Sequence, residues 1–231
     1  MASPWTAAYA VSSPRASVSL MGTDGARRAS ASTTASAPDV LDRPRDKTRA
    51  DEVSQSALQF LFAEMVSYCQ ERVSGIADFE RLLGSMGRRV GIRLLILITH
   101  RTQTASNPKR PQRDTRLLKT LLWLHTTFWK TAFGFQADSL ERSTEIERTD
   151  EYMISSNKPL FASGISVPKD MSQLSIEAFT AGIVEGALEG LGFPARVTAH
   201  AVPTDAYPDR TTILIKLDKS VMEREVAMGG P

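Results

Sequence analysis

Three glycines, Gly182, Gly186 and Gly190, recur every fourth residue in a stretch whose apolar residues have helical spacing. Each glycine inside a helix costs roughly 0.8–1.0 kcal/mol relative to alanine, so another interaction must offset that loss. Residues four apart lie on one face of a helix, and glycines on that face let a second backbone approach closely. The pattern predicts a helix over residues 174–191 that packs tightly on a neighbouring helix or on a sheet.

The segment over residues 77–100 has the same character. Its bulky apolar residues lie on one side of the predicted helix, and its glycines lie on another. Van der Waals contact across a flat, glycine-lined face offsets the reduced helix propensity. We therefore predict close packing of helices at six glycines: Gly84, Gly87, Gly91, Gly182, Gly186 and Gly190.

Hydrophobic periodicity divides the chain into helical and extended segments. Apolar residues at every third or fourth position predict helices over residues 54–73, 77–100, 115–132 and 174–191. Alternating apolar and polar residues predict strands over 140–147, 151–155, 195–200 and 212–217, with a hairpin loop at 203–209. This order predicts an α+β domain in which helices pack on a small antiparallel sheet.

Composition sets the expected limits of that domain. Residues 1–50 are rich in Ala, Ser, Thr and Arg with little apolar periodicity, which predicts a disordered extension; a cleaved organellar transit peptide is the alternative. The domain is expected over residues 51–221, followed by a C-terminal tail over 222–231. No apolar run approaches the roughly 20 residues that span a bilayer, and we expect a cytoplasmic protein.

The residues that carry chemistry form no recognisable constellation. With 28 basic and 26 acidic residues the chain has a net charge of +2, which predicts no broad attraction to nucleic acid. Nucleophile and nucleotide-binding motifs are absent from the sequence, and its three histidines lack metal-ligand spacing. Glu185 and Glu189 are interpreted as a solvated helix face that excludes lipid, and His125 as a packed, satisfied histidine. We predict no catalytic residue, metal or cofactor, and hence no enzyme.

Three stretches resemble a known family. They are LGSMGRRVGIRLL at 83–95, YMISSNKPLFASGISVPKDMSQL at 152–174 and FTAGIVEGALEGLGFPARVTAH at 179–200. Together they are similar to the small subunits of the transport protein particle, TRAPP, a complex that tethers vesicles, and the last two match one branch of it. The resemblance covers about residues 54–221; the loops at 102–114 and 203–209 depart from the family pattern.

The resemblance implies a fold and a role. The fold would place helices on one side of a four-stranded antiparallel sheet. The role would be that of a non-catalytic connector between the central acylated subunit and a longin-type subunit. The assembled complex promotes nucleotide exchange on a Rab-type GTPase in transport between endoplasmic reticulum and Golgi, peripherally at those membranes. A module that binds an acyl chain or another apolar ligand is the alternative.

The broad apolar arcs of the first three helices fit such a connector. The candidate partner interface comprises Leu61, Met65, Met86, Val90, Trp123, Phe128 and Trp129. In the acylated subunit the modified cysteine follows the second helix, where this chain has none. Cys69, the sole cysteine, falls within the first predicted helix, so we expect it to pack in the core and acylation not to carry over.

Overall fold

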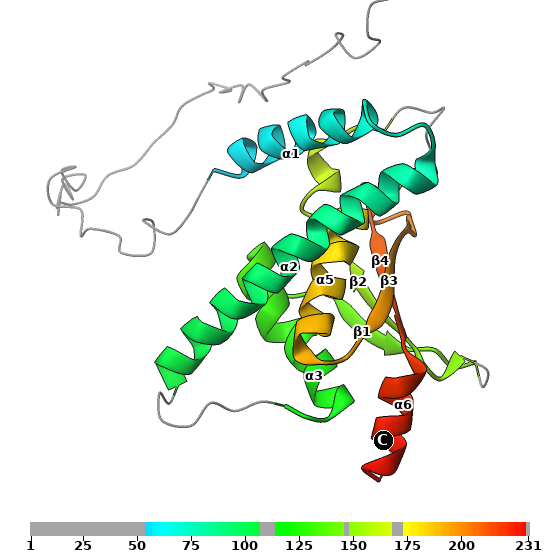
Figure 1. The fold of residues 1–231 in the computed structure, drawn as a ribbon. Helices are drawn as coiled ribbons and strands as arrows, with labels where there is room; N and C mark the ends of the chain where they lie inside the picture. Colours follow the sequence, from blue (N-terminus) through cyan, green and yellow to red (C-terminus); the bar gives the residue numbers. More distant parts are fainter. Residues whose placement is uncertain (1–53, 107–113, 146–147, 168–172, 230–231) are drawn as a thin grey trace, which may run out of the picture. The chain divides into compact units, whose positions relative to one another are not determined.

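The computed structural model describes residues 54–106, 114–145, 148–167 and 173–229 of the chain (Figure 1). The extension predicted over residues 1–50 lies outside these ranges. Within the described ranges, none of the helices has the length and apolar character needed to cross a membrane.

Helices form where apolar residues recur with helical spacing. One of them is longer than predicted, and another starts later than predicted. The long second helix continues past residue 100. The glycine-bearing helix starts at residue 178, because residues 174–175 are irregular and residues 176–177 form a turn. The helices are α1 (Gln55–Gln70), α2 (Ile76–Ser106), α3 (Leu117–Trp123), α4 (Trp129–Phe133), α5 (Ala178–Leu191) and α6 (Lys219–Ala227). A π-helical turn, Leu124–Phe128, joins α3 directly to α4.

Four strands form one antiparallel sheet in the order β1-β2-β4-β3. They are β1 (Ser139–Arg142), β2 (Glu151–Ser156), β3 (Ala195–Ala201) and β4 (Thr211–Leu217). The α+β class and the antiparallel pairing are as predicted, and β3 and β4 form the expected hairpin. The first strand is shorter than predicted, because its pairing with β2 ends at Arg142.

One face of the sheet is apolar and lies against the helices. The register places Tyr152 of β2 opposite Ile215 of β4, which in turn lies opposite Val197 of β3. All three side chains are buried. Helix α5 covers this face, and α2 crosses α5 on the side away from the sheet (Figure 1). Helix α5 is therefore an internal layer, with ten of its 14 residues buried.

Glycine ends α5 where the chain turns back into the sheet. Gly192 has φ of 84°, a left-handed conformation that glycine adopts without a steric penalty. Its N–H donates to the carbonyl of Glu189, and the Phe193 N–H donates to the carbonyl of Leu188. The strand β3 then begins three residues later, directly beside α5.

Helix α6 was not predicted from the sequence. Its Val221 is 1% exposed and its Glu225 is 4% exposed. The Oε1 atom of Glu225 accepts a hydrogen bond of 2.9 Å from the Leu117 N–H and so caps the N-terminus of α3, which lies more than 100 residues earlier. The ordered fold thus continues past residue 221, where the sequence analysis placed the start of a tail.

Candidate functional site: the helix crossing and the outer helical faces

The crossing of α2 and α5 is built from glycines of both helices. A Cβ atom at Gly87 would overlap the carbonyl oxygen of Phe179, and one at Gly91 would overlap that of Ile183. In the other direction, a Cβ at Gly182 would overlap the carbonyl oxygen of Gly84. Gly186 faces the carbonyl of Arg88 in the same way. Backbone therefore lies on backbone, without side chains between the two helices at these points.

The other two predicted glycines pack less tightly. A Cβ at Gly84 would lie 3.6 Å from the carbonyl oxygen of Ala178, an ordinary contact. A Cβ at Gly190 would lie 2.6 Å from Cδ2 of Leu95, a flexible side-chain end. The six glycines thus belong to one helix crossing, but only four of them meet backbone at close range.

An ion pair joins α2 and α5 at the edge of this crossing. Arg88 donates from Nε and Nη2 to the two carboxylate oxygens of Glu189, each at 2.6 Å. This hydrogen bond holds the pKa of the Glu189 carboxyl below its ordinary value. Glu185 lies at 4.0 Å from Arg88, and burial raises its pKa. The two glutamates, interpreted from the sequence as a solvated face, therefore connect α5 to α2.

The candidate interface residues fall into three groups by exposure: exposed, partly buried and fully buried. Leu61 and Val90 are exposed, at 68% and 38%. Met65, Met86 and Trp123 are partly buried and pack against the core.

Phe128 and Trp129 are core residues, with exposures of 0% and 3%, so they do not form part of an outer surface. Phe128 packs on the Trp123 ring at a centroid distance of 5.8 Å, and Trp129 packs on Phe133 at 4.8 Å. The sequence left open whether this helix is buried by other elements or by a partner. Other elements of the chain bury it at these two positions.

Further apolar side chains reach the surface of the first three helices. In α1, Leu61 and Tyr68 lie seven residues apart and are both exposed; in α2, Val90 and Leu97 have the same spacing and are both exposed. We call these four residues, with the partly buried Met65 and Met86, the outer helical faces. Tyr68 and Leu97 were not part of the predicted interface, although their spacing from Leu61 and Val90 was available as a signal.

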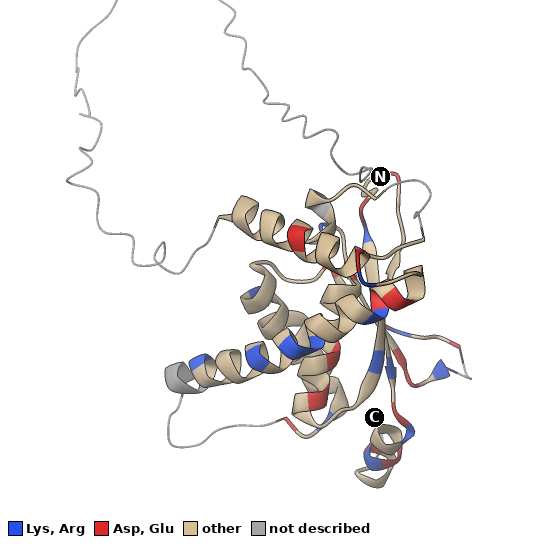
Figure 2. Ribbon diagram, turned by 45° about the horizontal axis from the view of Figure 1, so that its top comes forward, with Lys and Arg blue, Asp and Glu red and all other residues tan. Residues whose placement is uncertain are grey.

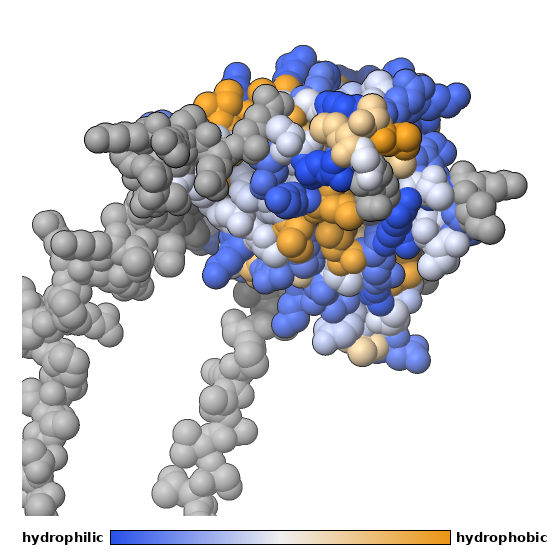
Figure 3. All heavy atoms as spheres, turned by 90° about the horizontal axis from the view of Figure 1, so that it is seen from below, coloured by the Kyte–Doolittle hydropathy of each residue, from blue (hydrophilic) through white to orange (hydrophobic). Residues whose placement is uncertain are grey.

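More exposed apolar residues lie on other sides of α2 and α3. They are Ile92, Ile96, Leu118 and Leu122. Seen from below, the molecule shows an apolar patch near the middle of the visible surface, surrounded by hydrophilic residues (Figure 3). Several large apolar side chains on neighbouring helices are typical of surfaces that bind a partner.

The charged residues of α2 after Glu80 are all basic. They are Arg81, Arg88, Arg89, Arg93 and Arg101, and they follow the helix along its length (Figure 2). Arg88 and Arg81 pair with carboxylates of this chain. Arg89 and Arg93 form no ion pair with any described residue and are exposed, so α2 presents both apolar and positively charged side chains to solvent.

The described residues show no group of three His, Cys, Asp or Glu side chains that could hold a metal ion. His125 lies in the π-helical turn and is 8% exposed. Among the described residues, neither of its ring nitrogens has a hydrogen-bond partner. The residue is therefore packed, as expected, but no described residue satisfies its ring nitrogens.

Glu177 is a buried carboxylate that the sequence analysis did not single out. Its Oε1 atom accepts the backbone N–H groups of Phe161 at 3.1 Å and Ala162 at 2.8 Å, and Oε2 accepts the hydroxyl of Thr180. Burial raises its pKa, although these three hydrogen bonds oppose the shift. Glu177 thus ties the loop after β2 to the first turn of α5.

Cys69 is expected to react with a maleimide only when the chain unfolds. Its side chain is fully buried, its Sγ lies 3.8 Å from Sδ of Met86, and burial raises the pKa of the thiol. A buried, protonated thiol is a poor nucleophile. Because the chain has one cysteine, the mass increase of the native protein measures this site alone. Labelling in denaturant is the positive control, and labelling of the native protein at the rate of a free thiol would contradict the prediction.

The family comparison agrees with this architecture. The profile of the transport protein particle (TRAPP) component family matches residues 58–218, which is more than half of the chain. The chain belongs to this family. It is therefore a subunit of the kind that builds the TRAPP complex and acts in vesicle trafficking.

Curated relatives identify the branch. The chain is 46% identical to trafficking protein particle complex subunit 5 of Dictyostelium discoideum, with 80% of this chain and 95% of that protein covered. It is 40% identical to subunit 5 of Homo sapiens, with 83% and 92% covered. Subunit 31 of Saccharomyces cerevisiae is 30% identical, with 77% and 80% covered. The branch that the two longer motifs resemble is therefore subunit 5.

A solved structure shares the fold. Subunit 3 of the complex from Naegleria fowleri, covalently bound to palmitic acid, superposes with a TM-score of 0.58 at 18% identity. The match covers 71% of this chain and 95% of that one. At this identity the likeness concerns the fold, and it agrees with helices on a four-stranded sheet.

Proposed function

We propose that this chain is a non-catalytic connector in the TRAPP complex. The observation that carries the proposal is the outer helical faces, where exposed Leu61, Tyr68, Val90 and Leu97 lie on two helices at regular spacing. Isolated exposed apolar residues need no explanation, but a set of them on adjoining helices favours a protein partner. The crossing with α5 fixes α2 on the core, so the α2 part of this surface is preformed.

The proposed partners are other subunits of the complex, the central acylated subunit and a longin-type subunit. The family resemblance supports this choice, and the names of the relatives support other subunits of the complex as partners in general. Arg89 and Arg93, which form no ion pair with a described residue, add a chemical condition, since a partner surface at α2 should carry carboxylates beside its apolar residues. Action on a Rab-type GTPase would belong to the assembled complex. We expect the chain in the cytoplasm, peripherally at endoplasmic reticulum and cis-Golgi.

A negative charge at the outer helical faces should weaken assembly. We expect Leu61→Asp combined with Val90→Asp to reduce co-purification with the co-expressed subunits at least about tenfold, because a carboxylate buried without a partner charge costs several kcal/mol and about 1.4 kcal/mol already corresponds to a tenfold change in affinity. Both side chains are exposed in the free chain, so the fold should persist. Circular dichroism of the variant checks that it does.

Val226→Asp is the matched control. Val226 is 69% exposed on α6, away from α1 and α2, and its substitution should leave co-purification unchanged. Full assembly of the double variant, or a wild-type chain that stays a stable monomer at high concentration beside its partners, would contradict the connector proposal.

The alternative, a module for an acyl chain, has weaker support. The sole cysteine is buried against Met86 and offers no attachment point at the surface. Native mass spectrometry distinguishes the two proposals, because bound lipid would favour the module and bound subunits would favour the connector. We propose no catalytic activity for the chain.

A further inference from the structure

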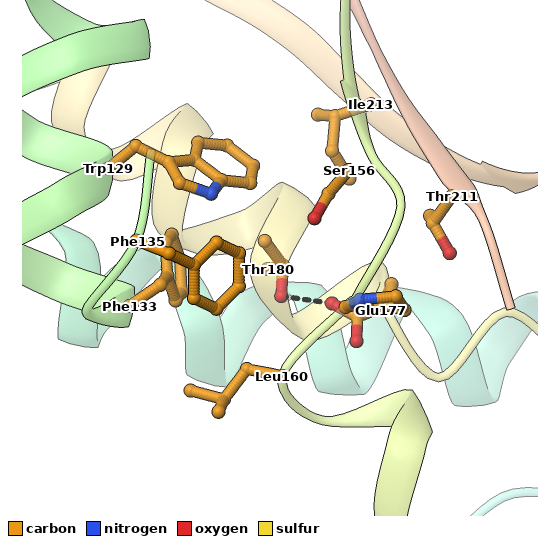
Figure 4. Close-up of a pocket in the computed structure, with 10 residues that line it drawn as sticks. Trp129, Phe133, Phe135, Ser156, Leu160, Glu177, Thr180, Thr211 and Ile213 are labelled. Atoms are coloured by element: carbon orange, nitrogen blue, oxygen red, sulfur yellow. Dashed lines mark hydrogen bonds between the residues drawn. The ribbon is translucent and has the colours of Figure 1, made fainter. Parts of the chain in front are cut away.

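A small cavity lies between α4, β2 and α5 (Figure 4). Its volume is about 10 Å³. The walls combine aromatic rings with polar side chains, and they come from parts of the chain that are far apart in sequence. The polar groups of the wall include those of Trp129 in α4, Ser156 in β2, and Glu177 and Thr180 at the start of α5.

Two polar atoms in this wall lack a hydrogen-bond partner among the residues that the structure describes. They are Nε1 of Trp129 and Oγ of Ser156, both inaccessible to solvent. Trp129 and Ser156 are each 3% exposed. Figure 4 shows the indole nitrogen and the hydroxyl oxygen on the side chains that border the same space. Buried polar groups in native proteins are paired with protein or with an ordered water in the great majority of cases, so this pair indicates a missing ligand.

The other polar groups of the wall are already engaged. The Thr180 hydroxyl donates its proton to Glu177, and Glu177 also accepts from two backbone N–H groups. Thr180 Oγ1 consequently has a lone pair left but no proton to give. The cavity therefore offers three polar groups to a ligand. The Trp129 N–H can only donate a hydrogen bond, Thr180 Oγ1 can only accept one, and the Ser156 hydroxyl can do either.

We infer that this cavity binds a single water molecule that links α4, β2 and α5. The water accepts the Trp129 N–H and donates its two protons to Ser156 Oγ and Thr180 Oγ1. Three hydrogen bonds are the usual number for a buried water, and a cavity of roughly 10–15 Å³ is enough to hold one. The volume is too small for a hydrocarbon chain, and the two unpaired groups favour a polar ligand over an empty apolar space.

A surface groove lies beside the cavity. It has a volume of about 770 Å³ and shares Phe133, Phe135, Pro159 and Leu160 with the cavity wall. The water is therefore expected to exchange with bulk solvent through movement of these side chains. The site is independent of the proposed connector role, because none of its residues belongs to the outer helical faces.

Crystal structures of the full chain in complex with its partner subunit test the inference. We expect a spherical density peak within about 2.6–3.2 Å of both Trp129 Nε1 and Ser156 Oγ. In Ser156→Val, the two methyl groups should occupy the space and the peak should be lost, with the backbone of β2 unchanged. Trp129→Phe keeps a smaller aromatic ring at this position but removes the N–H donor, and it should lower the occupancy of the peak at the original water position.

Other outcomes would overturn the site. An empty, well-ordered cavity in the wild type, a direct hydrogen bond between Trp129 and Ser156, or elongated density from an apolar molecule would each do so. If Ser156→Val does not fold, the wild-type and Trp129→Phe structures still decide the question, since unchanged occupancy without the indole N–H would also contradict the proposed role of Trp129.

Discussion

Alanine in place of Gly182 should destabilise the chain by about 3 kcal/mol or more, at the upper end of overpacking effects. The added methyl group would overlap the backbone of Gly84, and backbone cannot rotate away as a side chain can. The gain in helix propensity, roughly 1 kcal/mol, is too small to compensate. Thermal unfolding of the full chain purified with its partner subunit should show a melting temperature lower by several degrees. Gly186→Leu, which faces Arg88 backbone, should behave in the same way.

Gly84→Ala is a matched control within the same crossing. Its Cβ would lie 3.6 Å from the nearest atom, so the propensity gain should appear without overlap, and the melting temperature should stay level or rise. If Gly182→Ala or Gly186→Leu melts at or above the wild-type temperature, close backbone contact is not the reason for the glycines.

Removal of the Glu177 carboxylate should have a comparably large effect. In Glu177→Ala, the buried N–H of Phe161, the half-buried N–H of Ala162 and the buried hydroxyl of Thr180 lose their acceptor. Each unsatisfied buried group costs about 1–3 kcal/mol, so the free energy of unfolding should fall by about 3 kcal/mol or more. Hydrogen exchange should also increase at the amides of residues 161 and 162.

Glu177→Gln separates hydrogen bonding from charge. The amide oxygen can keep the two backbone hydrogen bonds, and the side chain is neutral like the protonated acid. Because burial raises the native pKa of Glu177 above the ordinary 4.5, the native state holds the proton more tightly than the unfolded state. Wild-type stability relative to Glu177→Gln should therefore be greatest below pH 4.5 and decline as pH rises through the native pKa. A relative stability that increases over this range would contradict the sign.

The sequence predicted those features that depend on residues close together along the chain. The glycine spacing in two segments indicated the tight packing of α2 and α5, because four-residue spacing places residues on one helix face. Alternation in 195–200 and 212–217 indicated the β3–β4 hairpin. The exposed Leu61 and Val90 also follow from helical spacing on the side away from the core.

Features that depend on contacts distant in sequence were missed. Helix α6 is polar apart from a few residues, and its position depends on Glu225, which caps α3 from more than 100 residues away. Phe128 and Trp129 face the core, whereas Leu122 is 57% exposed. Because all three are large apolar residues, their composition alone does not distinguish them. The π-helical turn between α3 and α4 adds to the difficulty, because it changes which residues share a face.

The backbone contact between α2 and α5 also bears on how the surface of such a subunit can change during evolution. Glycines, main-chain atoms and buried side chains such as Leu83 and Ile98 hold α2 in place, whereas the exposed side chains of its outer face contribute little to that attachment. Substitutions at positions such as Val90 and Leu97 can therefore accumulate without loss of the fold. One helix pair can in this way serve as a constant frame on which related chains display different surfaces to different neighbours.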